Sequence, residues 1–155
     1  ALDKSGRKLS ISEHDSLLKM NVSALKSSCP LPGYVSLFVG MPMILHSQNL
    51  STDLGITNGS QGIVQQIFIT RSSAGFNHAS CVLVHFPDSK VHLSKLPQGW
   101  YPICPATWTF TTTMDGANGI QERLWITRAQ VPLQPAFAIT AHSVQGKTLP
   151  RVLVN

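Results

Sequence analysis

The residues Gly146, Lys147 and Thr148 look like the end of a phosphate-binding loop. In such a loop an earlier glycine lets the backbone wrap the phosphates, the lysine neutralises them and the hydroxyl holds Mg²⁺. Ala141 stands where that earlier glycine is needed. Pro150 follows Thr148 closely, whereas the loop must lead into a helix whose amides hold the phosphate. We therefore expect that this stretch is not a P-loop.

Three histidines offer a second kind of chemistry, because paired imidazoles can act as general acid and general base. His85 and His92 lie on either side of Asp88, and His142 belongs to the stretch just described. A small nuclease that uses these three side chains is therefore one alternative function. Histidines on strands are more common than active sites, so the pattern alone does not select this alternative.

The cysteines predict no metal centre. They are Cys29, Cys81 and Cys104. They form no Cys-x-x-Cys pair, and no two histidines have the spacing of a zinc finger. Their odd number leaves at least one thiol unpaired within the chain, which favours a reducing, intracellular compartment. Three Asn-x-Ser triplets keep open another alternative, a secreted or defence-type β-protein that binds a glycan or a protein.

The charge balance favours an acidic partner. The 155 residues include 12 Lys and Arg against 7 Asp and Glu, which gives a net charge of +5. Nucleic acid is a plausible partner for a basic chain. The only glutamates are Glu13 and Glu122, and no Asp-Glu pair is present to hold magnesium. No apolar run approaches the roughly 18 residues of a membrane-spanning helix, so we expect no membrane partner.

These residues must be positioned by one helix followed by strands. Apolar residues recur at helical spacing from Ile11 to Ser28, with Ser12 as the expected N-cap. The expected strands are Tyr34–Val39, Met43–His46, Gly62–Ile69, Ser80–Phe86, Trp108–Thr113 and Gln121–Thr127. Alternation within the fifth strand places Trp108 in the core.

Turn residues divide the strands. The Gly- and Asn-rich run Asp115–Gly119 predicts a hairpin between the last two strands. Three prolines and a glycine predict an irregular loop from Lys95 to Ala106. Short strands with such turns indicate a mainly β protein with minor α content, built around a small barrel of about five strands. We expect a helix and strands over 1–57, the barrel over 58–128 and a strand-loop-helix segment over 129–155.

Three stretches resemble superfamily 1B DNA helicases, in particular the petite-integration-frequency family and its Helitron-transposon relatives. Thr140–Leu149 resembles motif V, which in the family reads roughly Thr-x-His-Lys-Ser-Gln-Gly-x-Thr-Leu. Phe38–Leu45, followed by Asn49-Leu50 and by Gly55–Val64, is similar to the family's Gly-Met-Pro and Asn-Gly segment. Arg128–Leu133 is similar to the lead-in to motif V. The stretches keep the family's order, and the resemblance covers about 31–155.

The resemblance implies an SH3-like barrel inserted in a truncated second RecA-like domain. It implies that Thr140 and His142, with Ser143 beside them, contact the DNA backbone, and that Gln145 and Gly146 approach the γ-phosphate of a nucleotide. The chain departs from the pattern at Ser143 and the next residue, where Lys and Ser are usual, so one cation is missing.

Two further residues are expected to contact nucleic acid. Arg128, at the end of a strand, is a candidate for a phosphate contact, and Trp100, in the expected loop, is a candidate for stacking on an unpaired base. For Asn58 and Gly59 we expect a turn that enters the barrel.

The resemblance thus implies a non-catalytic, helicase-derived module that binds single-stranded DNA or RNA. A full-length helicase would use ATP and Mg²⁺, but this chain carries no P-loop, no Asp-Glu motif and no arginine finger, so we expect neither ATPase activity nor a cofactor for it alone. The expected partners are nucleic acid and the remainder of a helicase chain. The expected location is intracellular and nuclear, with secretion as the alternative.

Overall fold

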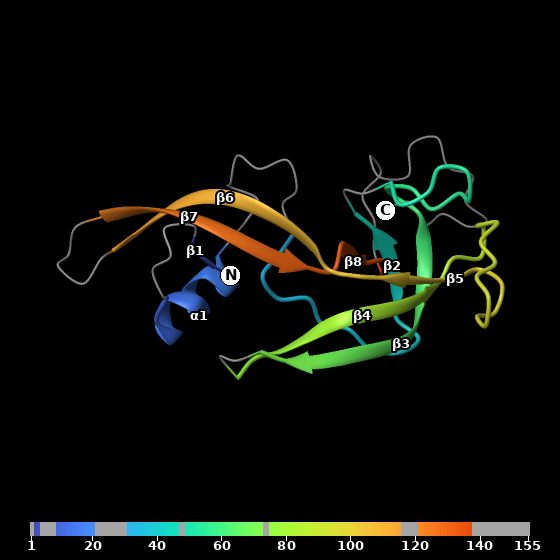
Figure 1. Ribbon diagram of the computed structural model, residues 1–155, viewed down its shortest axis with the longest axis horizontal. Helices are drawn as coiled ribbons and strands as arrows, with labels where there is room; N and C mark the ends of the chain where they lie inside the picture. Colours follow the sequence, from blue (N-terminus) through green and yellow to red (C-terminus); the bar gives the residue numbers. More distant parts are fainter. Residues whose placement is uncertain are drawn as a thin grey trace, which may run out of the picture.

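The strands form two antiparallel sheets, and one long hairpin makes up most of the smaller sheet (Figure 1). The computed structural model describes residues 2–3, 9–20, 31–46, 49–72, 75–115 and 121–137. The elements in these ranges are β1 (Leu2–Asp3), α1 (Ile11–Lys19), β2 (Pro42–Leu45), β3 (Gln61–Arg71), β4 (Asn77–His85), β5 (Trp100–Ile103), β6 (Ala106–Asp115), β7 (Gln121–Gln130) and β8 (Leu133–Pro135). The expected fold class, mainly β with minor α content, is confirmed for the described part of the chain.

The larger sheet has five strands in the order β5-β4-β3-β2-β8. Strands β2 to β5 follow one another as neighbours, and β8 then returns to pair with β2, so that the last strand lies beside the first. In the described ranges β5 and β8 are the two edges of this sheet, which does not close into a complete barrel. Two register shifts, at Val64/Gln66 and Phe68/Ile69, interrupt the β3–β4 ladder. Such bulges bend a strand and increase its twist.

The main core lies on one face of the five-stranded sheet. Alternation places Met43 and Leu45 of β2 inward, and Val64 of β3 and Val84 of β4 meet them. Loop residues such as Ile56 complete the cluster, and each of these five side chains has no exposed surface. Burial of this kind is the main stabilising contribution to such a fold.

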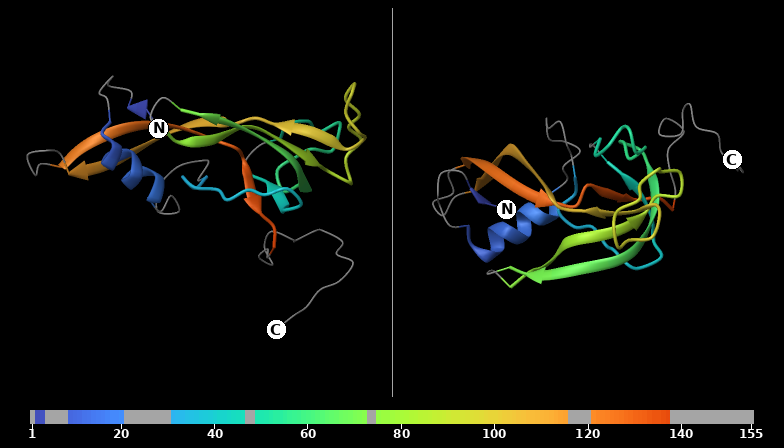
Figure 2. Two further views of the ribbon diagram at one scale, coloured as in Figure 1. Left: turned by 90° about the horizontal axis from the view of Figure 1, so that it is seen from below. Right: turned by 45° about the vertical axis from the view of Figure 1, so that its right-hand side comes forward.

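The smaller sheet has the order β1-β7-β6, and α1 packs against it (Figure 2). Leu17 of the helix forms a second cluster with Phe110, Leu124 and Ile126 of the hairpin. The expected hairpin is confirmed by the β6–β7 ladder, which extends to Asp115, while residues 116–120 lie outside the described ranges. The expected inward face of β6 is confirmed as well, since Phe110 is buried and Trp108 packs against the same cluster.

The start of the helix differs from the prediction. Ser10, not Ser12, is the N-cap, because its hydroxyl accepts from the Glu13 amide (3.2 Å) while the Glu13 carboxylate accepts from the Ser10 amide (2.7 Å). This reciprocal capping box satisfies two amides that the first helical turn leaves without partners. The helix ends at Lys19, and residues 21–30 lie outside the described ranges.

Two strand predictions were wrong. Strand β5 lies within the segment that was expected to be an irregular loop. It accommodates Pro102 because it is an edge strand, where a missing amide donor can face away from the ladder. The segment Tyr34–Val39 belongs to neither sheet. Its alternating apolar residues have another cause, since Val35 and Leu37 pack against the main core without strand pairing.

Candidate nucleic-acid interface

Most of the predicted site residues lie outside the part of the chain that the structure describes. These residues are Thr140, His142, Ser143, Gln145 and Gly146. Their predicted contacts with DNA and nucleotide stay predictions. The described residues show the structural setting that precedes the segment resembling motif V, because the description extends to Phe137.

The structure brings together the other stretches that resemble the helicase family. Strand β2, from the Phe38–Leu45 stretch, is flanked by β3 on one side and by β8 on the other. Met43 is paired with Gly62 in β3 and with Pro135 in β8. Segments from distant parts of the chain therefore form three neighbouring strands of one sheet. The Arg128–Leu133 stretch contributes its last residue to this group, since Leu133 begins β8, whereas its first three residues end β7 of the smaller sheet.

A close approach of β3 to β4 explains why a glycine stands at position 62. Gly62 is buried where β3 passes β4, and a Cβ atom at this position would lie 2.5 Å from the Val84 side chain and 2.8 Å from the His85 carbonyl oxygen. Both distances are too short for an ordinary contact. Glycine is thus required by the packing of the sheet.

The expected turn at Asn58 and Gly59 is confirmed. Gly59 has a φ of 86°, in the region that favours glycine, and its amide donates to the Leu45 carbonyl at 2.7 Å. The Asn58 amide donates to Oδ1 of Asn49 at 2.9 Å. The Asn49 side chain therefore has a structural role, because it holds the turn between β2 and β3 through the backbone amide of Asn58.

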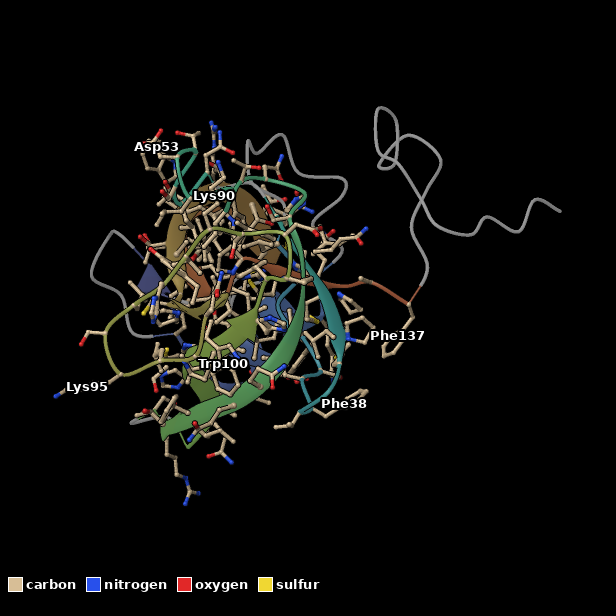
Figure 3. The ribbon with its side chains drawn as sticks, turned by 90° about the vertical axis from the view of Figure 1, so that its right-hand side faces the viewer. Phe38, Asp53, Lys90, Lys95, Trp100 and Phe137 are labelled. Carbon is tan, nitrogen blue, oxygen red and sulfur yellow. The ribbon has the colours of Figure 1, made fainter. Side chains whose placement is uncertain are left out.

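An exposed aromatic pair lies at the edge of this three-strand group. The rings of Phe38 and Phe137 are stacked, with 6.1 Å between their centroids and 20° between their planes. Phe38 is 53% exposed and Phe137 is 65% exposed. Figure 3 shows both side chains on the same side of the molecule, beside the point where the described chain ends. Sequence reasoning missed this pair, because only the β2–β8 pairing brings the two residues together.

Trp100 is placed elsewhere on the same sheet. It is the first residue of β5, it lies opposite His85 in the register, and it is half-buried. Since β5 and β8 are opposite edges of the sheet, the structure does not bring Trp100 into the aromatic pair. Trp100 presents a separate, partly accessible indole (Figure 3).

Arg128 lies inside the protein. Its side chain is 2% exposed, and Nη2 donates to the Leu17 carbonyl oxygen of α1. The guanidinium carbon lies 5.0 Å from the ring centroid of Phe110 and 5.9 Å from that of Trp108. Burial lowers the pKa of Arg128, because desolvation disfavours the charged form. In this arrangement the guanidinium holds α1 to the hairpin instead of facing the solvent, where a phosphate would meet it.

The described residues include two of the three histidines of the nuclease alternative, which stays a prediction. His85 lies in β4 and is half-buried, His92 is exposed in the following loop, and His142 lies outside the described ranges. Among the described residues, no three His, Cys, Asp or Glu side chains come together in a way that could hold a metal ion. The helix that the structure describes is too short to cross a membrane.

Neither a scan against protein-family models nor a search of curated proteins finds a match for this chain.

Proposed function

We propose that this chain is a helicase-derived module that binds single-stranded nucleic acid and has no ATPase activity of its own. One observation carries the proposal: the resembling stretches Phe38–Leu45 and Gly55–Val64 pair as β2 and β3, and β8, which begins at the last residue of the Arg128–Leu133 stretch, pairs with β2 on the other side. The exposed Phe38–Phe137 stack lies beside this three-strand group. The proposal rests on the sequence resemblance together with this strand pairing and the exposed aromatic stack.

The strand order supports the finer fold assignment that belongs to this proposal. A meander whose last strand returns to its first is the connectivity by which a small sheet curls toward a barrel, and strands β2 to β5 with β8 follow it. The bulges in the β3–β4 ladder supply the curvature. We propose that the SH3-like barrel expected over 58–128 is built instead from β2 to β5 with β8, without β6 and β7, and that a RecA-like domain carries this open barrel as an insertion.

The proposed binding mode combines stacking with phosphate contacts. Exposed rings provide platforms for unpaired bases, at about 1–3 kcal/mol per base. Thr140 follows Phe137 by three positions, so its Cα lies at most about 11 Å away along the chain. The Thr140 hydroxyl and the His142 imidazole would then contact phosphates of the strand whose bases stack on the rings. Arg128 is not part of this surface, because it is buried.

In a full-length helicase, Gln145 and Gly146 would face the γ-phosphate of ATP, whose phosphates and Mg²⁺ are bound by other parts of that chain. A glycine amide can approach an anion closely because no Cβ intervenes. The partners of the module are then single-stranded nucleic acid and the remainder of a helicase chain, in the nucleus.

The test is fluorescence anisotropy of a labelled oligothymidylate with the full chain, at about 50 and about 200 mM salt. We expect binding that weakens with salt, and a loss of about tenfold in affinity for Phe137→Leu and for His142→Ala. The matched control is Phe68→Leu, since Phe68 is also an exposed phenylalanine (43%) but lies in β3 outside the pair. Absence of binding by the parent, or an equal loss in the Phe68 control, would contradict the proposal.

A further inference from the structure

Two free thiols lie next to each other across neighbouring strands. Cys81 belongs to β4, and Cys104 directly follows β5. The register pairs Val82 with Ile103. Because the strands are antiparallel, the next position outward places Cys81 opposite Cys104.

The hydrogen-bond pattern shows whether Cys81 and Cys104 occupy a hydrogen-bonded or a non-hydrogen-bonded position of the antiparallel ladder. The Phe86 amide donates to the Gly99 carbonyl at 2.8 Å, so that position is of the hydrogen-bonded kind. The two kinds alternate along an antiparallel ladder. Counting from Phe86 and Gly99 in the register, Leu83 with Pro102 is a non-hydrogen-bonded pair, and so is Cys81 with Cys104. Proline at position 102 agrees with this count, because it has no amide to donate.

The non-hydrogen-bonded position is the one that suits a disulfide. Residues in such pairs have Cα atoms about 4.5 Å apart, and their side chains approach more closely than in the other kind of pair. Disulfides span Cα separations of about 4.4–6.8 Å. The backbone therefore holds the two cysteines at a distance that a disulfide can bridge without moving either strand.

The two thiols differ in their accessibility. Cys104 is exposed, whereas Cys81 is half-buried. Burial raises the pKa of the Cys81 thiol, and the neighbouring Cys104 raises it further through charge and hydrogen bonding. An oxidant in solution thus reaches Cys104 first, and Cys81 is placed to react with the product.

We propose that Cys81 and Cys104 are a reversible dithiol–disulfide pair that joins β4 to the end of β5. The oxidant is a small-molecule disulfide such as oxidised glutathione. The Cys104 thiolate attacks one sulfur, forms a mixed disulfide and releases one glutathione thiolate. The Cys81 thiolate then attacks Sγ of Cys104 and releases the second glutathione. In total, two cysteine thiols are oxidised, one oxidised glutathione is reduced to two thiols, and the two cysteine protons go to these products.

The bond would fix the base of the long hairpin. Cys104 and Pro105 are the link between β5 of the larger sheet and β6 of the smaller one (Figure 1). Val131 and Pro132 form the return link, from β7 to β8. Oxidation would thus anchor one of these two links covalently, and reduction would release it.

The test uses the full chain with Cys29→Ser, so that only the proposed pair remains. After equilibration with oxidised glutathione and blocking of free thiols, the intact mass should show loss of two hydrogens and no adduct. Trypsin separates the cysteines at Lys90 and Lys95, so a disulfide between peptides 72–90 and 96–123 identifies the bond. We expect the oxidised form to melt about 5–10 °C above the reduced form.

Single Cys81→Ser and Cys104→Ser variants in the same background are the controls, and neither should gain thermal stability on oxidation. In the Cys81→Ser variant, the glutathione adduct on Cys104 should persist, because no second thiol removes it. If a variant fails to fold, the disulfide between the same two tryptic peptides is measured in the parent chain instead. A lasting adduct on Cys104 with Cys81 intact, or disulfides only between molecules, would overturn the proposal.

Discussion

Arg128 donates a hydrogen bond from Nη2 to the carbonyl oxygen of Leu17, so a buried guanidinium connects strand β7 to helix α1. Its Nε and Nη1 atoms are buried and have no hydrogen-bond partner among the described residues. The rings of Phe110 and Trp108 face the cation and offset part of the cost of burying it. A buried charge with few partners is a weak source of stability, because desolvation opposes its interactions.

We expect Arg128→Met to retain the free energy of unfolding of the parent to within about 1 kcal/mol, because an apolar side chain of similar length removes the buried charge. Arg128→Lys should be less stable than the parent by about 2 kcal/mol, since a lysine ammonium is more strongly hydrated and cannot stack flat on the rings. Urea denaturation of the parent and the two variants measures their order of stability. A methionine variant less stable than the lysine variant would contradict this account.

Gly62 should not tolerate a side chain. The added Cβ of Gly62→Ala would lie 2.5 Å from the Val84 side chain and 2.8 Å from the His85 carbonyl oxygen, so the β3–β4 contact must open. We expect a loss of about 2 kcal/mol in the free energy of unfolding, typical of overpacking. Gln66→Ala, at an exposed position of the same strand, is the control and should change stability by less than about 0.5 kcal/mol. Equal effects at both positions would contradict the packing argument.

His46 should make stability depend on pH. Its Nε2 atom is buried and has no partner among the described residues, and burial lowers the pKa of His46 from its usual 6.5. His46 therefore takes up a proton more readily in the unfolded chain than in the folded protein. For this reason the free energy of unfolding falls as the pH drops below 6.5 toward the folded-state pKa. His46→Gln should weaken this fall in melting temperature between about pH 7 and about pH 5, while His92→Gln, at an exposed position, should not. The same pH profile of melting temperature in the parent and in both variants would exclude His46 as the source of the pH dependence.

The turn between β2 and β3 depends on one side-chain acceptor. Asn49→Ala removes the oxygen that accepts from the Asn58 amide, and we expect a loss of about 1 kcal/mol in the free energy of unfolding. Asn49→Asp keeps an acceptor at the same place and should restore most of that loss. Chemical denaturation compares the variants, and equal losses for alanine and aspartate would show that the hydrogen bond is not the cause.

Much of the fold was predictable because local composition and pattern determine it. The strands around β3, β4, β6 and β7 were found from β-branched and aromatic residues, and the turn at Gly59 from the residues that favour positive φ. Pro102 concealed β5, since only the sheet order shows that β5 is an edge strand. The Tyr34–Val39 prediction was wrong because alternation also arises when an unpaired segment packs on a core.

The site was less predictable, because its described features depend on contacts between distant segments. Arg128 has the sequence context of an exposed strand end, and it is buried because α1 docks on the hairpin. The Phe38–Phe137 stack depends on the pairing of β2 with β8. Neither contact has a signal within a short sequence window.

The pairing of β2 with β8 has a further consequence. It places the beginning and the end of the five-stranded unit side by side, as the 6.1 Å separation of the Phe38 and Phe137 rings shows. A unit with adjacent ends can be spliced into a loop of another protein without pulling that loop apart. The segment 38–137 can therefore leave and rejoin a host domain at neighbouring points, while β6 and β7 within it reach out to pair with β1 and to pack on α1.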